Sequence, residues 1–199
     1  MPQPTIILSE ITKENDLPKK FHRQYHTHLY CHRGNIKFLF SDQKMECKAG
    51  QFIFWFAESR LSGLQFSNNF KATVLLVEKD FLTNNIPDQS WGINAMLYVR
   101  IHPITEIHTK RDKEKILGNF KRMNERFLET DHRFYDEVLK LQMKLFILEM
   151  WNLFANAYEN RRHSVQTGTT YEQFMQLLSE HCLQQREVQF YSAKLNITA

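Results

Sequence analysis

Two apolar stripes on one long predicted helix constrain the fold of this chain more than any other feature. After a break at Thr130-Asp131, apolar side chains recur at helical spacing between residues 132 and 159. The first stripe consists of Phe134, Val138, Leu141, Leu145 and Leu148, and the second of Leu139, Met143, Phe146, Met150, Leu153 and Ala157. A surface helix on a single core needs only one stripe. Two stripes predict burial on two sides, one against the helix's own domain and one against a neighbouring helix or a second subunit.

The dimer contact is assigned to the second stripe. Its candidate residues are Leu139, Met143, Phe146, Met150 and Leu153. A shorter helix over 113–129, capped by Asp112, precedes the long one and has its own apolar stripe. The sequence therefore predicts two long antiparallel dimerisation helices over residues 105–160. The alternative is a long helix buried wholly within one monomer.

Short strands are predicted for residues 1–104. Gln24–Cys31 alternates between two faces, Gln51–Phe56 is rich in aromatic residues, and Leu97–Ile101 is the last apolar run. Turn-forming sequence such as Arg33-Gly34-Asn35 separates the runs. Many short strands at this spacing predict a sandwich or barrel, so the fold class is α+β.

Charge and cysteine content narrow the class of protein. The 26 Lys and Arg residues exceed the 22 Asp and Glu residues by only four. No segment has the concentrated positive charge of a complete DNA-binding surface. Cys31, Cys47 and Cys182 lack the spacing of a metal site or a disulfide framework, so we expect reduced thiols. We see no signal peptide or membrane span in the sequence and expect a cytoplasmic protein.

A small helical unit is predicted at 170–199, after a polar linker over 161–169. Thr170–Gln173 fits a helix-capping box, and the helix that follows contains Phe174, Leu177 and Leu178. A turn at 184–186 leads to a second, short helix over Glu187–Leu195.

This unit resembles the first two helices of the DNA-binding domain of AraC/XylS transcription regulators. The family pattern there is an apolar helix, a basic-polar turn, an aromatic-Ala pair, Leu and a small apolar-Thr ending. The matching residues are Phe174, Val188, Tyr191, Ala193, Leu195, Ile197 and Thr198. The sequence departs from the commonest form at Ser192, which is inserted between the aromatic residue and the alanine.

The rest of the chain is similar to the same family in architecture. Gly34–Phe38 and Gln43–Phe54 resemble the small cupin-like barrel that senses ligands in many members, and 113–159 resembles the dimerisation helices. The resemblance implies a non-enzymatic regulator that forms a homodimer and binds an unknown small-molecule effector. The family reads DNA with recognition helices that this chain ends before, so we expect DNA contact through a missing C-terminal domain.

His26 and His28 are the first candidates for metal chemistry. Alternate residues of a strand point the same way, so the two imidazoles could share an ion. Metal cupins usually add a glutamate soon afterwards and another histidine in the second half. Here Arg33 and Gly34 follow His32 instead. We therefore predict no metal and no cofactor, and a metal-dependent cupin enzyme remains the alternative function.

A small-molecule pocket inside the barrel is predicted instead. Its candidate residues are His26, His28, Tyr30, Phe38, Phe54 and Trp55. Phe54 and Trp55 are consecutive in a strand and must point to opposite faces. If the aromatic side chains only fill the core, the chain is a dimerisation module without a ligand. The sequence has no phosphate-binding loop, nucleophile elbow or catalytic Cys-His spacing.

Overall fold

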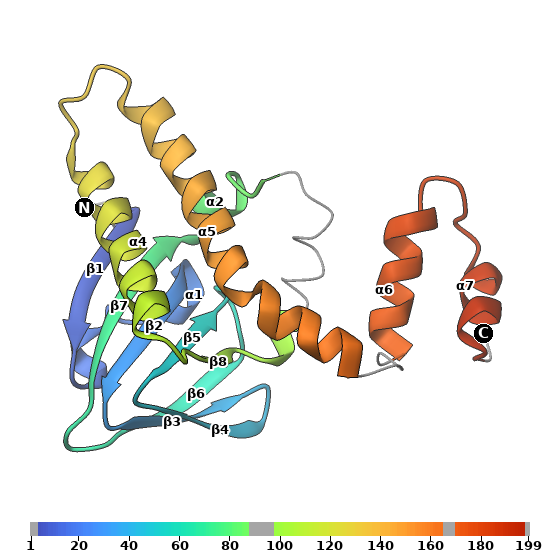
Figure 1. Cartoon of the computed structure of the whole chain (residues 1–199), viewed down its shortest axis with the longest axis horizontal. Coiled ribbons are helices and arrows are strands. Elements are labelled where there is room, and N and C mark those ends of the chain that lie inside the picture. Colours follow the sequence, from blue (N-terminus) through green and yellow to red (C-terminus); the bar gives the residue numbers. More distant parts are fainter. Residues whose placement is uncertain (1–3, 88–97, 165–169, 198–199) are drawn as a thin grey trace.

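The computed structural model describes residues 4–87, 98–164 and 170–197. The strands are β1 (Ile6–Ile11), β2 (Tyr25–Arg33), β3 (Asn35–Phe40), β4 (Gln43–Lys48), β5 (Gln51–Trp55), β6 (Leu61–Phe66), β7 (Lys71–Glu78) and β8 (Ile104–Glu106). The short helices η1 (Glu14–Asp16), α1 (Phe21–Gln24) and α2 (Lys79–Thr83) lie between them. The longer helices α4 (Lys110–Leu128), α5 (Tyr135–Ser164), α6 (Thr170–His181) and α7 (Val188–Leu195) follow (Figure 1).

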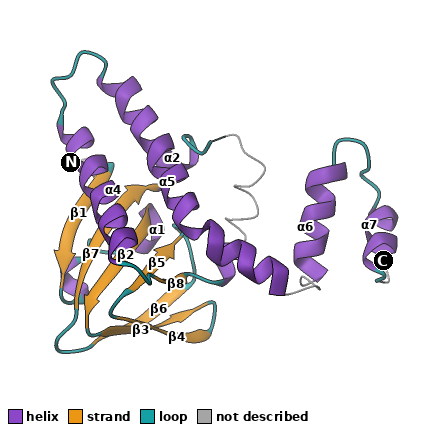
Figure 2. Cartoon of the chain, viewed as in Figure 1, coloured by secondary structure: helices purple, strands orange, loops and turns teal. Residues whose placement is uncertain are grey.

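The described strands form two antiparallel sheets. The larger sheet has the order β1-β7-β2-β5-β8, and the smaller has the order β4-β3-β6 (Figure 2). The α+β prediction is confirmed, and the described strands form two sheets with no closed barrel, so the expected cupin-like barrel is not confirmed. The turn between β4 and β5 contains Gly50 at a φ of +87°, and it carries the chain from one sheet to the other. The strand predicted at 97–101 is also wrong, because residues 98–101 are helical and β8 begins at Ile104.

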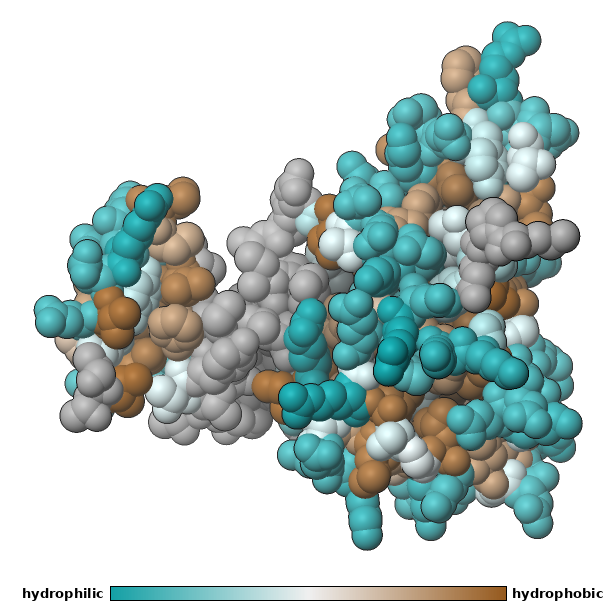
Figure 3. Space-filling model, turned by 180° about the vertical axis from the view of Figure 1, so that it is seen from behind, coloured by the Kyte–Doolittle hydropathy of each residue, from teal (hydrophilic) through white to brown (hydrophobic). Residues whose placement is uncertain are grey.

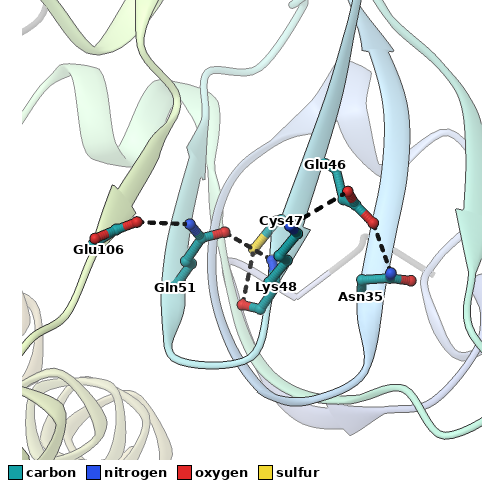
Figure 4. A network of polar contacts seen from close by, with 6 residues as sticks. All are labelled: Asn35, Glu46, Cys47, Lys48, Gln51 and Glu106. Atoms are coloured by element: carbon teal, nitrogen blue, oxygen red, sulfur yellow. Dashed lines mark hydrogen bonds and ion pairs between the residues drawn. The ribbon is translucent and has the colours of Figure 1, made fainter.

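Polar contacts link four strands around that turn (Figure 4). Asn35 Nδ2 donates to Glu46 Oε1 at 2.7 Å, between β3 and β4. Gln51 Oε1 accepts from the Lys48 backbone N–H at 2.7 Å, and Gln51 Nε2 reaches Glu106 Oε1 of β8 at 3.5 Å. The network therefore spans the place where the two sheets meet.

Side-chain alternation along β2 and β5 gives the larger sheet two apolar faces, because successive strand residues point to opposite sides. One face forms an inter-sheet core with the smaller sheet. That core includes Tyr25, Leu29, Cys31, Phe38, Phe40, Ile53 and Trp55. The other face forms a helix-side core with α4 and α5. It includes Tyr30, Phe52, Leu75, Val77, Ile116, Phe120, Met143 and Phe146.

Helices α4 and α5 form an antiparallel hairpin over the larger sheet (Figure 1). The cap of α4 is Thr109 rather than the predicted Asp112, because the Thr109 hydroxyl accepts from the Asp112 backbone N–H at 3.0 Å. Near the tip of the hairpin, the Tyr135 hydroxyl donates to the Phe127 carbonyl at 2.7 Å. This hydrogen bond joins the start of α5 to the end of α4.

The C-terminal region contains the predicted pair of short helices, α6 and α7. Figure 1 shows them beyond the C-terminal end of α5, away from the sheets. The predicted linker over 161–169 is wrong in its first part, because α5 continues to Ser164. Residues 165–169 of that linker lie outside the described ranges.

Candidate ligand site and dimerisation surface

The six predicted pocket residues divide between the two faces of the larger sheet. On β2 and β5, His26, His28, Tyr30 and Phe54 point toward the helices. The other two residues, Phe38 and Trp55, lie in the inter-sheet core with their rings 5.0 Å apart. The structure does not bring all six into one site, because strand alternation separates Phe54 from Trp55.

His28 lies at the centre of the group that faces the helices. Its ring centroid is 4.5 Å from that of Phe54, 5.0 Å from Phe146 of α5 and 6.2 Å from Phe120 of α4. His26 is stacked parallel to Phe54 at 6.1 Å. Phe120 and Phe146 were absent from the predicted site, because their helical stripes indicated burial and not which strand residues they would meet.

Polar atoms without a hydrogen-bond partner are present in both cores. On the helix side, His26 Nε2, His28 Nδ1 and Asn119 Nδ2 are buried and unpartnered within the described chain. Between the sheets, the same is true of Thr27 Oγ1 and Trp55 Nε1. An unsatisfied buried polar group costs about 1–3 kcal/mol, so such atoms mark places that can accept a ligand or an ordered water.

Burial keeps both histidines neutral at neutral pH. Burial, together with the neighbouring His26, lowers the pKa of His28 to about 3, against the opposing effect of a backbone hydrogen bond at Leu75. Burial also lowers the pKa of His26 to about 4, with the Lys79 backbone acting in the opposite direction. Two uncharged imidazoles can donate and accept hydrogen bonds in an apolar layer without bringing a charge into it.

A cation lies at one edge of this layer. The Arg100 guanidinium sits 4.7 Å from the centroid of the Phe56 ring, and that ring is 5.6 Å from His26. Arg100 is exposed, so the edge of the layer near His26 faces solvent. Arg100 was not among the predicted site residues. Residues 97–101 were expected to form a strand, whereas 98–101 are helical.

The described residues contain no group of three or more His, Cys, Asp or Glu side chains placed to hold a metal ion. His26 and His28 are surrounded mainly by phenylalanine rings, and these supply no further ligand. Two imidazoles without further ligands fall short of the four ligands that zinc takes in most protein sites.

The two stripes of α5 have opposite environments. The second stripe is buried within the chain, with Leu139, Met143, Phe146 and Met150 in the helix-side core and Leu153 packed against it. The prediction that this stripe forms the dimer contact is therefore wrong for the four buried residues, because the sheet and α4 already cover them. The first stripe is exposed instead, and 63% of Phe134 and 65% of Leu141 are accessible to solvent.

The exposed stripe has the spacing of a coiled-coil seam. Its members alternate in steps of four and three residues: Phe134, just before α5 begins, then Val138, Leu141, Leu145 and Leu148 of α5, and the next step reaches Asn152. Val138 is half-buried and the others are exposed. An apolar seam at this spacing is typical of a helix that packs against another helix.

The residues assigned to the start of the DNA-binding domain lie on α6 and α7. Phe174 of α6 contacts Tyr191 of α7, with ring centroids 5.6 Å apart, and Tyr191 is buried. Of the others, Val188 and Ala193 are exposed, Leu195 is half-buried, and Thr198 lies outside the described residues. Figure 3 shows apolar side chains gathered on this part of the chain, where Leu183 of the connecting turn and Val188 of α7 are exposed.

Only the comparison with solved structures gave matches to this chain, and they cover nearly its whole length. No protein-family model and no curated protein matches the sequence. Among solved structures, ToxT from Vibrio cholerae strain SCE256 with a bound unsaturated fatty acid is 9% identical, with a TM-score of 0.41 over 100% of this chain and 72% of ToxT. The AraC-like transcriptional activator CuxR is 8% identical, with a TM-score of 0.36 over 98% of this chain and 64% of CuxR.

Both likenesses are distant, with TM-scores below 0.5. At this identity, no residue role, ligand or partner is carried over from them. None of the helices in the described residues has a stretch both long enough and apolar enough to cross a membrane.

Proposed function

We propose that this chain is the effector-sensing and dimerisation part of a transcription regulator, and that DNA is bound through a C-terminal domain that begins with α6 and α7. The observation that carries the proposal is that α5 has two apolar faces, one inside the core and one open to solvent. A monomeric protein has no need to expose a regular apolar seam of this kind.

A second copy of the chain is the occupant that best suits the exposed stripe. Charged residues of both signs flank it, with Glu137 and Lys144 on one side and Glu149 on the other. Pairing two such helices can place unlike charges together, so electrostatic repulsion does not oppose self-association. Asn152, at the end of the seam, is the kind of polar residue that fixes the register of paired helices.

Sensing and pairing would then share one element. The inner face of α5 contacts His28 through Phe146, while the outer face carries Leu145 and Leu148. A ligand that moves α5 relative to the sheet would change how two copies pair. Such a ligand acts only through different affinities for the two arrangements.

A reporter assay tests this function in the whole chain. The chain is fused to a DNA-binding domain that represses its reporter only as a dimer. We expect repression by the wild type and by Lys140→Gln, an exposed change on α5 outside the stripe. Repression should be lost in the double variant Leu141→Glu/Leu145→Glu, because each copy would bring two carboxylates into the seam. Equal repression by all three proteins would contradict the proposal.

A further inference from the structure

Two cysteines from different sheets meet in the inter-sheet core. Cys31 lies near the end of β2 and Cys47 near the end of β4, and both residues are fully buried. Backbone hydrogen bonds hold these strand ends together. The Gly50 N–H donates to the Cys31 carbonyl at 2.9 Å, and the Ala49 N–H donates to the Gly34 carbonyl at 3.1 Å. The turn that follows Cys47 is therefore fixed against the end of β2.

Hydrogen bonds orient the two sulfur atoms. The Cys31 thiol donates to the carbonyls of Arg33 and Gly34, with sulfur-to-oxygen distances of 3.4 and 3.7 Å. A thiol has one proton, so the Cys31 sulfur can accept a hydrogen bond on its other side. The Cys47 thiol is hydrogen-bonded to that sulfur, and its alternative acceptor is the Lys48 carbonyl at 3.8 Å (Figure 4). The two sulfurs therefore point toward each other, as a disulfide bond requires.

The shared hydrogen bond makes the two thiols unequal. It lowers the pKa of Cys31, because the bond from Cys47 stabilises a negative charge on the accepting sulfur. It raises the pKa of Cys47, which would lose the bond with its proton, and burial acts in the same direction. The thiolate is the reactive form of cysteine. Cys31 is therefore the nucleophile of the pair, and Cys47 is the proton donor beside it.

We propose that Cys31 and Cys47 form a disulfide bond between the two sheets when the protein meets hydrogen peroxide. The Cys31 sulfur first attacks one peroxide oxygen, the O–O bond breaks, and the second oxygen leaves as water with the Cys31 proton. Cys47 Sγ then attacks the sulfenic sulfur of Cys31, the S–O bond breaks, and the hydroxyl leaves as water with the Cys47 proton. The two thiols lose two electrons, which reduce the peroxide to two waters. This inference goes beyond the proposed function and does not depend on it.

The pair lies one or two residues along the chain from solvent. Arg33, Lys48 and Ala49 are exposed, and they border the two cysteines in sequence. A small oxidant reaches Cys31 by a local opening of the turns after β2 and β4. Oxidation of the pair should therefore be slower than that of Cys182, which is already exposed.

Thiol counting and peptide mapping test the proposal in the full chain. Protein carrying Cys182→Ser is treated with hydrogen peroxide, denatured and reacted with N-ethylmaleimide. We expect the reduced protein to take up two maleimide groups, and the oxidised protein to take up none and to lose two hydrogen atoms in mass. One disulfide-linked peptide pair should contain Cys31 and Cys47, and dithiothreitol should restore both thiols.

The wild type is the control for the oxidant, because its exposed Cys182 reports that the peroxide has acted. Cys31 and Cys47 that still take up maleimide after Cys182 is fully oxidised overturn the proposal. A gain of oxygen in place of the loss of hydrogen, or a disulfide bond between two chains, also overturns it.

Single substitutions in the Cys182→Ser protein separate the two roles. Cys47→Ala removes the second thiol, so Cys31 should accumulate as a sulfenic acid that dimedone labels. Cys31→Ala should leave Cys47 unlabelled, because that thiol keeps its proton. Labelling of Cys47 without labelling of Cys31 overturns the proposal. If either variant does not fold, the peptide map of the Cys182→Ser protein decides alone.

The melting temperature shows whether the bond fits the native packing. The disulfide would close a loop of fifteen residues, from His32 to Glu46. We expect oxidised Cys182→Ser protein to melt about 5–10 °C above the reduced protein, because the closed loop restricts the unfolded chain. Peroxide should give no such rise in the Cys47→Ala control. An oxidised protein that melts no higher than the reduced one overturns the proposal, because the bond would then form only by distorting the contact between the sheets.

Discussion

The two faces of the larger sheet are built from the same strands and yet differ in content. The inter-sheet face carries Leu29 and Trp55, and the face toward the helices carries His28 and Phe54. Both faces are buried, so solvent exposure does not explain why the imidazoles are on one side only. What differs is the layer that covers each face.

The inter-sheet core is covered by strands that are hydrogen-bonded into a second sheet, whereas the helix-side core is covered by a hairpin of two helices. A helix can shift against a sheet without breaking a ladder of backbone hydrogen bonds. The face toward the helices is therefore the better place for a binding site that must transmit a change. The predictions below test this difference, from the largest expected effect to the smallest.

Trp55→Ala should have the largest effect on stability. The side chain is 1% exposed in the inter-sheet core, so its removal leaves a cavity between two sheets that cannot close easily. We expect a loss of about 3–5 kcal/mol in the free energy of unfolding, measured by urea denaturation. A loss below about 1 kcal/mol would mean that the inter-sheet core adapts as readily as the helix side does.

Gly34→Ala tests the tightness of the same region at the β2–β3 turn. Gly34 has a φ of +69°, and an added Cβ would lie 2.3 Å from Ser67 Oγ and 2.9 Å from Phe70 Cα. The matched control is Gly50→Ala, where φ is +87° and no atom lies within 4 Å of the added Cβ. We expect Gly34→Ala to cost about 3 kcal/mol and Gly50→Ala about 1 kcal/mol, since only the first adds a clash to the backbone strain. Equal losses would show that the turn relaxes freely.

Acid should weaken the helix-side core through its two histidines. The unfolded chain takes up protons near the ordinary pKa of 6.5, whereas the folded state keeps the pKa of His26 at about 4 and that of His28 at about 3. Their contribution is fully present above about pH 6.5 and is lost as the pH falls from there toward these lower values. Each ring should remove about 1.4 kcal/mol per pH unit in that window. We measure the free energy of unfolding by urea denaturation at pH 6.5 and at pH 5.5. Between these pH values, His28→Leu should lose less stability than the wild type does. Equal losses in the two proteins would contradict a buried, neutral His28 ring.

Lys110→Ala should have the smallest effect. Lys110 and Glu114 form an ion pair at 3.7 Å on the outer side of α4, and both side chains are largely exposed. Such pairs contribute little because water screens them. We expect no resolvable change in melting temperature at physiological salt, and a clear drop would show that α4 depends on its outer face.

Periodicity in the sequence predicted the element types well and their partners less well. The spacing of Leu141 and Leu145 against Met143 and Phe146 correctly gave two apolar sides of one helix. It could not say which side meets the sheet, because both stripes are apolar and the choice depends on how the tertiary structure places α4. The alternation of His26 and His28 likewise placed them on one face without showing that helices, rather than strands, cover it.

The strand pattern could not decide between a sandwich and a barrel. A run of short strands fits a sandwich and a barrel equally, and the difference lies in pairings between strands far apart in the sequence. The β5–β8 pairing joins Ile53 to Ile104, across fifty residues that give no local signal for it. The C-terminal pair was easier, because the helices that carry Phe174 and Tyr191 are consecutive in the chain and each has its own local signal.

Sedimentation equilibrium of the purified chain tests the central claim, that α5 joins a sensing core to a dimer surface. The wild type and the Lys140→Gln control should sediment as dimers at tens of micromolar. The Leu141→Glu/Leu145→Glu variant should be a folded monomer, whereas Met143→Glu, on the buried side of the same helix, should unfold. A wild type that is monomeric at this concentration, or a Leu141→Glu/Leu145→Glu variant that remains a dimer, would contradict the account.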